Sequence, residues 1–233
     1  MKNMLRRGIA ALLLSCAAEA NATPEFLLEP SGQATGSSCQ SYALAVALAF
    51  KRDAAFPVQT ASDLRKVETG IRSKIKQAAG SADVTHVHVK AGFDAYTSGR
   101  YKLTIKPGEL AAVGNAVAAR SGVSSEQATP PTFLLGAVVK DVLLASATRI
   151  GKDSYGGGHI FTILGATLPA NSSQKFLILN SGVKVKGENT ARKACSDGVP
   201  DKLDPYVAML GWTKSVDIEF KQASGKVLLW TID

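Results

Sequence analysis

Among the residues of this sequence, Cys39 has the sequence surroundings that best fit a catalytic role. It follows the Gly/Ser-rich stretch Ser31–Ser38 and precedes an apolar run, Tyr42–Phe50, that predicts a buried helix. A thiol attacks a carbonyl only as the thiolate, and both a helix N-terminus and a nearby imidazolium lower the pKa of a cysteine. First-turn N–H groups can also hold a developing oxyanion. We therefore interpret Cys39 as a candidate nucleophile for acyl transfer.

Three further motifs lie in a suggestive order around this cysteine. Gln33 stands six residues before Cys39, Gly156-Gly157-Gly158 leads into His159 and an apolar run, and a second run, Phe176–Leu179, ends in Asn180-Ser181-Gly182. Gly187-Glu188-Asn189 follows. In these residues and in this order the chain resembles the papain-like cysteine peptidases, whose His and Asn lie roughly 130 to 150 residues beyond the cysteine.

The resemblance implies an α+β, papain-like fold, with a helical N-terminal lobe packed on a β-rich C-terminal lobe and the site between them. It implies that Cys39 is the nucleophile, His159 the base and Asn180 the group that orients the imidazole. Gln33 would supply a side-chain N–H to the oxyanion. The activity implied is that of an exported cysteine peptidase, acting through a thioester on peptide or isopeptide bonds of a protein or peptide substrate, without cofactor or metal.

The sequence departs from the family pattern on both sides of the site. Gly36-Ser37-Ser38-Cys39-Gln40 lacks the family's tryptophan after the nucleophile and the cysteine that precedes it there. Gly182 replaces the tryptophan that follows the Asn-Ser pair. We therefore expect another residue to shield the hydrogen bond between Asn180 and His159.

Two other functions use similar residues. An envelope amidase or a transglutaminase-like acyltransferase would also need Cys and His, but transglutaminase-like enzymes usually place Asp where this chain has Asn180. A non-catalytic binding protein on the same scaffold is the third hypothesis. It predicts that Cys39 is buried, disulfide-bonded or far from His159.

The first 22 residues have the pattern of a secretory signal. Its parts are the basic residues Lys2, Arg6 and Arg7, the apolar run Ile9–Leu14 and the cleavage pattern Ala20-Asn21-Ala22. We expect cleavage after Ala22 and a secreted or periplasmic protein without an integral membrane segment, because no later apolar run is long enough to span a bilayer. Leu13-Leu14-Ser15-Cys16 resembles a lipobox, so a lipid anchor at Cys16 is a competing interpretation.

Net charge and cysteine content limit the binding partners and disulfides that we expect for this chain. The chain has 27 Lys and Arg against 19 Asp and Glu, a net charge of +8, but the basic residues are dispersed and no nucleic-acid motif accompanies them. We expect no nucleic-acid partner and a monomer. After signal cleavage only Cys39 and Cys195 remain, so a disulfide framework is not predicted; a single bridge between these two is the structural alternative to catalysis.

We expect one domain over residues 23–233, mostly helical to about residue 130 and β-rich from 131. Helices are predicted over 63–79, capped by Thr60 or Ser62 and closed by Gly80, and from Pro107-Gly108 to Arg120. Strands are predicted over 84–89, 101–105, 159–168, 175–179, 216–220 and 226–232. The apolar segment 133–147 fits either a helix or a strand followed by a helix.

His86 and His88 form a His-x-His pair within the predicted strand 84–89. Two imidazoles on one strand face could bind a metal. No Cys or further His lies nearby in sequence to complete a ligand set, so we expect solvent-facing histidines and no metal.

Overall fold

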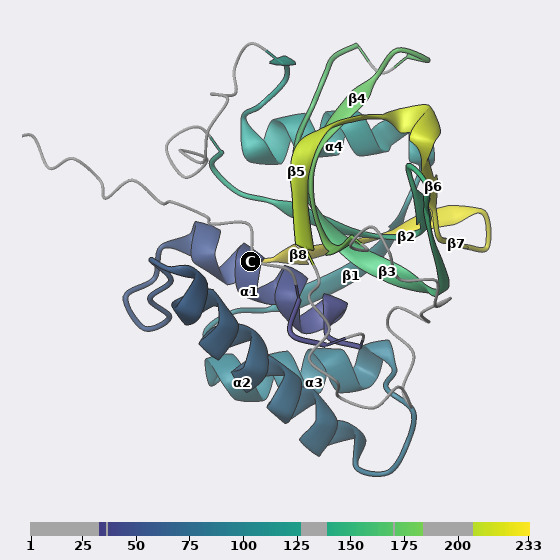
Figure 1. Ribbon diagram of the computed structural model, residues 1–233. Coiled ribbons are helices and arrows are strands. Elements are labelled where there is room, and N and C mark those ends of the chain that lie inside the picture. Colours follow the sequence, from purple (N-terminus) through teal and green to yellow (C-terminus); the bar gives the residue numbers. More distant parts are fainter. Residues whose placement is uncertain (1–32, 36, 127–138, 170, 184–206) are drawn as a thin grey trace, which may run out of the picture.

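The computed structural model describes residues 33–35, 37–126, 139–169, 171–183 and 207–233. Three helices, α1 (Cys39–Lys51), α2 (Ala61–Ala79) and α3 (His86–Thr97), lie together beside a curved antiparallel sheet, with α1 between α2 and the strands (Figure 1). The chain is therefore of the α+β class, as predicted. None of the described helices is long and apolar enough to cross a membrane.

The sheet brings together strands from distant parts of the chain. Its order is β1-β8-β2-β3-β4-β5, with β6 paired to β2 and β7 to β8, and every pairing is antiparallel. The strands are β1 (Leu103–Gly108), β2 (Leu143–Ile150), β3 (Asp153–Ala166), β4 (Lys175–Val183), β5 (Val207–Lys214), β6 (Ile218–Phe220), β7 (Gln222–Ala223) and β8 (Lys226–Ile232). The adjacent strands β3 and β4 carry His159 and Asn180.

The central strands are apolar on both faces, because each face is covered. Ile160 and Leu179 belong to the core that packs with α1, α2 and α3. Phe161 and Ile178, one residue away in each strand, belong to a second core with helix α4 (Val113–Ser121). This alternation follows from the two-residue period of a strand.

Helix α2 confirms the clearest prediction from sequence. Thr60 is its N-cap, forming a reciprocal capping box with Asp63, and Gly80 is the C-cap. Leu64, Val67, Ile71 and Ile75 are its buried apolar residues. The capping residues and the apolar stripe both indicate the same helix, and the tertiary contacts are consistent with it.

The predicted strand over 84–89 is wrong, since His86 begins helix α3. The alternating valines suggested a strand, but Thr85 and the His88 imidazole form a capping box at the helix start. Val89, Gly92 and Phe93 are the residues that helical spacing turns toward α2 and the core. Burial of this helical face therefore outweighs the strand preference of the valines.

The predicted helix from Pro107-Gly108 is also wrong at its start. Strand β1 continues through Gly108, the 3-10 turn η1 (Leu110–Ala112) follows, and α4 begins only at Val113. Among the described strands, β1 lies at the edge of the sheet and pairs with β8 alone, so the missing N–H of Pro107 is tolerated. In segment 133–147, β2 begins at Leu143; residues 127–138 lie outside the described chain.

Replacing Gly92 with alanine should destabilise the fold by about 2 kcal/mol, the usual cost of overpacking a closed core. A Cβ there would lie 2.5 Å from the backbone N and Cα of Ile75, atoms of α2 that cannot turn aside. Urea unfolding measures the change. G211A is the matched control, because a Cβ at Gly211 meets nothing within 4 Å; equal stability of the two variants would contradict the packing argument.

Candidate active site

His159 and Asn180 form a buried pair on neighbouring strands. His159 Nε2 lies 2.7 Å from Asn180 Oδ1, and both side chains have no exposed surface. The Asn180 oxygen also accepts the backbone N–H of Gly182 at 3.1 Å, and its Nδ2 donates to the Tyr155 hydroxyl at 2.9 Å. The structure therefore places these two predicted site residues in contact.

These contacts determine which imidazole nitrogen carries the proton. The Gly182 N–H can only donate, so the Asn180 atom facing it must be the oxygen. That oxygen can only accept, so His159 Nε2 must carry the proton. Burial lowers the pKa of His159 to about 4, while the hydrogen bond to Asn180 raises it. The ring is thus neutral at ordinary pH, with Nδ1 as its basic atom.

Tyr155 covers the hydrogen bond between His159 and Asn180, at a site where Gly182 replaces the tryptophan expected from the family pattern. Its ring stacks on the His159 imidazole, with centroids 4.3 Å apart and planes 19° from parallel. Burial raises the pKa of the Tyr155 phenol, so its hydroxyl keeps its proton and its oxygen accepts from Asn180. One side chain therefore covers the imidazole and anchors the amide that orients it.

A bulge before His159 makes this stacking feasible. In the pairing of β2 with β3, Arg149 faces Ser154 but Ala147 faces His159, so five steps along β3 match two along β2. Tyr155 and the three glycines lie between Ser154 and His159 in this stretch, and Gly158 has φ +90°. Lys221 Nζ donates to Gly157 O at 2.7 Å and holds the bulge. The glycine run therefore serves to fold Tyr155 back over the imidazole.

Gln33 is attached to the same strand as Asn180. Its backbone N–H donates to Ser181 O at 3.2 Å, and its side-chain Oε1 accepts the Ser181 hydroxyl at 2.9 Å. Gln33 Nε2 donates to Thr35 O at 2.7 Å. The glutamine predicted for the oxyanion thus lies beside the residue that follows Asn180.

The buried carboxylate of Glu68 holds the loop between Gln33 and Cys39. Its Oε1 accepts the Ala34 N–H and the Ser38 hydroxyl, both at 2.7 Å, and its Oε2 accepts from Arg65. Burial raises the pKa of Glu68, against these hydrogen bonds and the charges of Arg65 and Arg72. The loop is therefore fastened to α2 on one side and, through Gln33, to β4 on the other.

Cys39 begins α1, as predicted, but it is buried and disulfide-bonded. The other cysteines of the chain, Cys16 and Cys195, lie outside the described residues. Cys39 belongs to the apolar core that packs with α1, α2 and α3, whereas Tyr155, which stacks on His159, belongs to the second core. Helix α1 packs directly on β3 and β4. Burial and a disulfide at Cys39 are what the hypothesis of a non-catalytic binding protein predicts.

The other features predicted from sequence lie partly inside and partly outside the described residues. Residues 1–22, the proposed signal, and Cys16 with its lipobox-like sequence lie outside the described chain, as does the Gly-Glu-Asn at 187–189. His86 and His88 lie in the first turn of α3, with His86 edge-on to the Trp230 ring at 5.3 Å. Within the described residues no three His, Cys, Asp or Glu side chains gather as a metal site.

Sequence reasoning missed two residues of the site. Glu68 had a signal, because it falls four residues after Leu64 and three before Ile71, within the apolar stripe of α2 where an acid needs a partner. Tyr155 shares the strand of His159 only four residues earlier. Regular strand geometry would place those side chains too far apart to stack, so only the bulge reveals the contact.

Comparison with protein-family models, with curated proteins and with solved structures finds no match for this chain. What the site can do is therefore argued from its own residues.

We expect NMR titration of the oxidised protein to show a His159 imidazole that stays neutral down to about pH 4. The H159Q spectrum identifies its signals among those of three histidines. An unfolded chain takes up this proton near pH 6.5, so the folded state should lose stability as the pH falls from 6.5 toward 4. A midpoint near 6.5 in the folded protein would contradict the buried, neutral ring.

Replacing Glu68 with alanine should cost about 3 kcal/mol of stability, because the Ala34 N–H and Ser38 hydroxyl would both lose a buried acceptor. The matched variant E68Q retains an amide oxygen for these donors, so we expect it to cost about 1 kcal/mol. Denaturant unfolding compares them. Equal losses would mean that charge, rather than hydrogen bonding to the loop, is what the carboxylate contributes.

Proposed function

We propose that this chain is a papain-like cysteine hydrolase of peptide or isopeptide bonds, described here in an oxidised, resting state. The observation that carries the proposal is the His159–Asn180 pair, whose hydrogen bonds assign the proton to Nε2 and leave Nδ1 as the base. A neutral amide in this position is suited to orient an imidazole rather than to take its proton. The placement of Gln33 against Ser181 and of Cys39 at the start of α1 supports the same assignment.

The reaction begins with reduction of the Cys39 disulfide. A dithiol reductant supplies two electrons and two protons by thiol–disulfide exchange, which releases Cys39 and its partner as thiols. Neither Cys39 nor His159 has exposed surface in the oxidised state, so substrate cannot reach them. In the proposed pair, the Cys39 thiolate formed after reduction would favour the imidazolium form of His159.

Acyl transfer then proceeds from named atoms. His159 Nδ1 takes the Cys39 proton, and the sulfur attacks the substrate carbonyl carbon. The backbone N–H of Cys39 and a Gln33 Nε2–H donate to the oxyanion, and the imidazolium gives its proton to the leaving amine as the C–N bond breaks. Water, activated by the same imidazole, hydrolyses the thioester to a carboxylic acid and restores the thiol.

The disulfide favours a second candidate function, a non-catalytic binding protein on the same scaffold. In that protein the bond to Cys39 is permanent, and the buried polar residues around His159 serve only to fix the strands. The two candidates differ in what the reduced chain does, because the reactivity of Cys39 depends on His159 only if the thiol and the imidazole form a pair.

Alkylation by iodoacetamide after reduction tests the proposal. We expect no labelling of Cys39 before treatment with dithiothreitol and rapid labelling afterwards, still evident at pH 6 because the thiolate persists below the usual pKa of cysteine. H159Q should slow this labelling at least tenfold. Peptide mass mapping measures the rate at each cysteine in the same sample, so Cys195 serves as the internal reference.

Hydrolysis of a fluorogenic peptide library gives the functional readout. The reduced wild-type chain should cleave members of the library, and C39S should cleave none. Circular dichroism of each variant shows whether it retains the fold. Slow labelling that does not depend on His159, in a folded chain without hydrolytic activity, would favour the binding protein and reject the hydrolase.

A further inference from the structure

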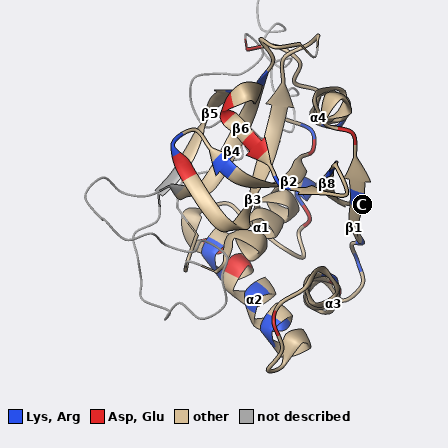
Figure 2. Cartoon of the chain, turned by 90° about the vertical axis from the view of Figure 1, so that its right-hand side faces the viewer, with Lys and Arg blue, Asp and Glu red and all other residues tan. Residues whose placement is uncertain are grey.

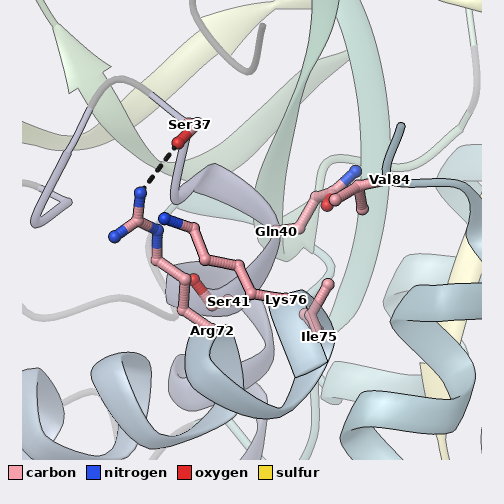
Figure 3. Close-up of a pocket in the computed structure, with 7 residues that line it drawn as sticks. All are labelled: Ser37, Gln40, Ser41, Arg72, Ile75, Lys76 and Val84. Atoms are coloured by element: carbon pink, nitrogen blue, oxygen red, sulfur yellow. Dashed lines mark hydrogen bonds between the residues drawn. The ribbon is translucent and has the colours of Figure 1, made fainter. Parts of the chain in front are cut away.

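A small pocket opens beside the first turn of α1, at residues that flank the proposed nucleophile Cys39 in sequence. It is lined by Ser37, Gln40, Ser41, Arg72, Ile75, Lys76 and Val84. Three of these residues bracket Cys39 in sequence, and three more come from one stretch of α2. Figure 3 shows the nitrogen-bearing ends of Arg72 and Lys76 on the same side of the pocket, away from Ile75 and Val84.

The pocket is positively charged. Arg72 and Lys76 are four residues apart on α2, a spacing at which side chains on a helix are neighbours and like charges repel. None of the seven lining residues is acidic. Figure 2 shows basic residues recurring along α2. Two cations held together on the wall of a pocket are a common device for binding an anionic group.

Arg72 and Lys76 differ in how they are used. Arg72 Nη2 donates to Ser37 Oγ at 3.1 Å, and the charge of Arg72 also favours ionised Glu68. Arg72 therefore helps to hold the loop before Cys39 as well as lining the pocket. The Lys76 side chain lines the same pocket and is more exposed than that of Arg72, so Lys76 provides the cleaner test.

We propose that this pocket, which we call the Arg72/Lys76 pocket, recognises a carboxylate of the substrate close to the bond that is cleaved. The inference rests on the proposed hydrolase function, because it is the position beside Cys39 that makes the pocket a specificity subsite. The carboxylate is supplied either by an internal Asp or Glu side chain or by the C-terminus of the peptide. Both present the same two oxygens to a guanidinium and an ammonium.

Paired fluorogenic peptides test this specificity on the reduced protein. Each pair places Glu or Gln at one position on either side of the scissile bond, with the C-terminus amidated, and a second series compares free with amidated C-termini. We expect a roughly tenfold higher kcat/KM for the carboxylate at one position, which is the size of effect that a charge-assisted contact gives. The series that shows the preference identifies the source of the carboxylate.

Variants of α2 locate the preference. K76Q should reduce the ratio of Glu to Gln kcat/KM severalfold while changing cleavage of the Gln peptide less than twofold, and K76E should favour a Lys peptide. K74Q, with its exposed lysine on the same helix but outside the pocket, should leave the ratio unchanged. R72Q should reduce the ratio and also lower stability.

The outcomes separate the two proposals. Cleavage without any preference for a carboxylate, or a preference that K76Q leaves intact, overturns the inference about the pocket but leaves the hydrolase standing. A reduced, folded chain that cleaves no peptide and whose Cys39 labelling ignores H159Q overturns the hydrolase and the pocket's role with it.

Discussion

The backbone N–H of Gly182 is the contact on which the chemistry of this site depends. It identifies the Asn180 oxygen, which in turn fixes the proton on His159 Nε2 and makes Nδ1 the basic atom. A backbone donor cannot reverse its role, whereas side-chain amides can flip. The absence of a side chain at Gly182 serves the same arrangement, because a Cβ there would lie 2.8 Å from His159 Cε1. Glycine therefore lets the strand approach the ring closely enough to donate.

Burial makes this arrangement stable and also constrains it. A polar group removed from water costs free energy unless it is hydrogen-bonded. The buried polar side chains of this site therefore form hydrogen bonds with one another or with nearby residues, as Asn180, Tyr155, Gln33 and Glu68 do. The result is a continuous polar connection from α2 through the loop before Cys39 to β4. Such connections join elements distant in sequence more specifically than apolar contacts do, since they require defined donor and acceptor positions.

The sequence predicts what is local or periodic and misses what depends on distant partners. Helix α2 could be predicted because its cap at Thr60 and its apolar stripe give the same answer. The strand predicted at 84–89 failed because burial of Gly92 and Phe93 against α2 is a tertiary effect. The helix predicted from Pro107 is wrong at its start because Pro107 lies in an edge strand whose position is set by pairing with β8. The contact of His159 with Asn180 was expected from the order of motifs. The stacking of Tyr155 on His159 could not be predicted, because it depends on a bulge that the sequence pattern does not indicate.

The oxidation state of Cys39 lies beyond any sequence pattern, because the same residues accommodate a thiol or a disulfide. Cys39 begins α1, a helix N-terminus favours a thiolate, and the thiolate is also the form that enters disulfide exchange. Reactivity toward carbonyls and susceptibility to oxidation thus arise from one cause. In an oxidising environment, a cysteine with these properties can therefore also form a disulfide with a second cysteine. The disulfide at Cys39 is compatible with a nucleophilic role for Cys39 in the reduced chain.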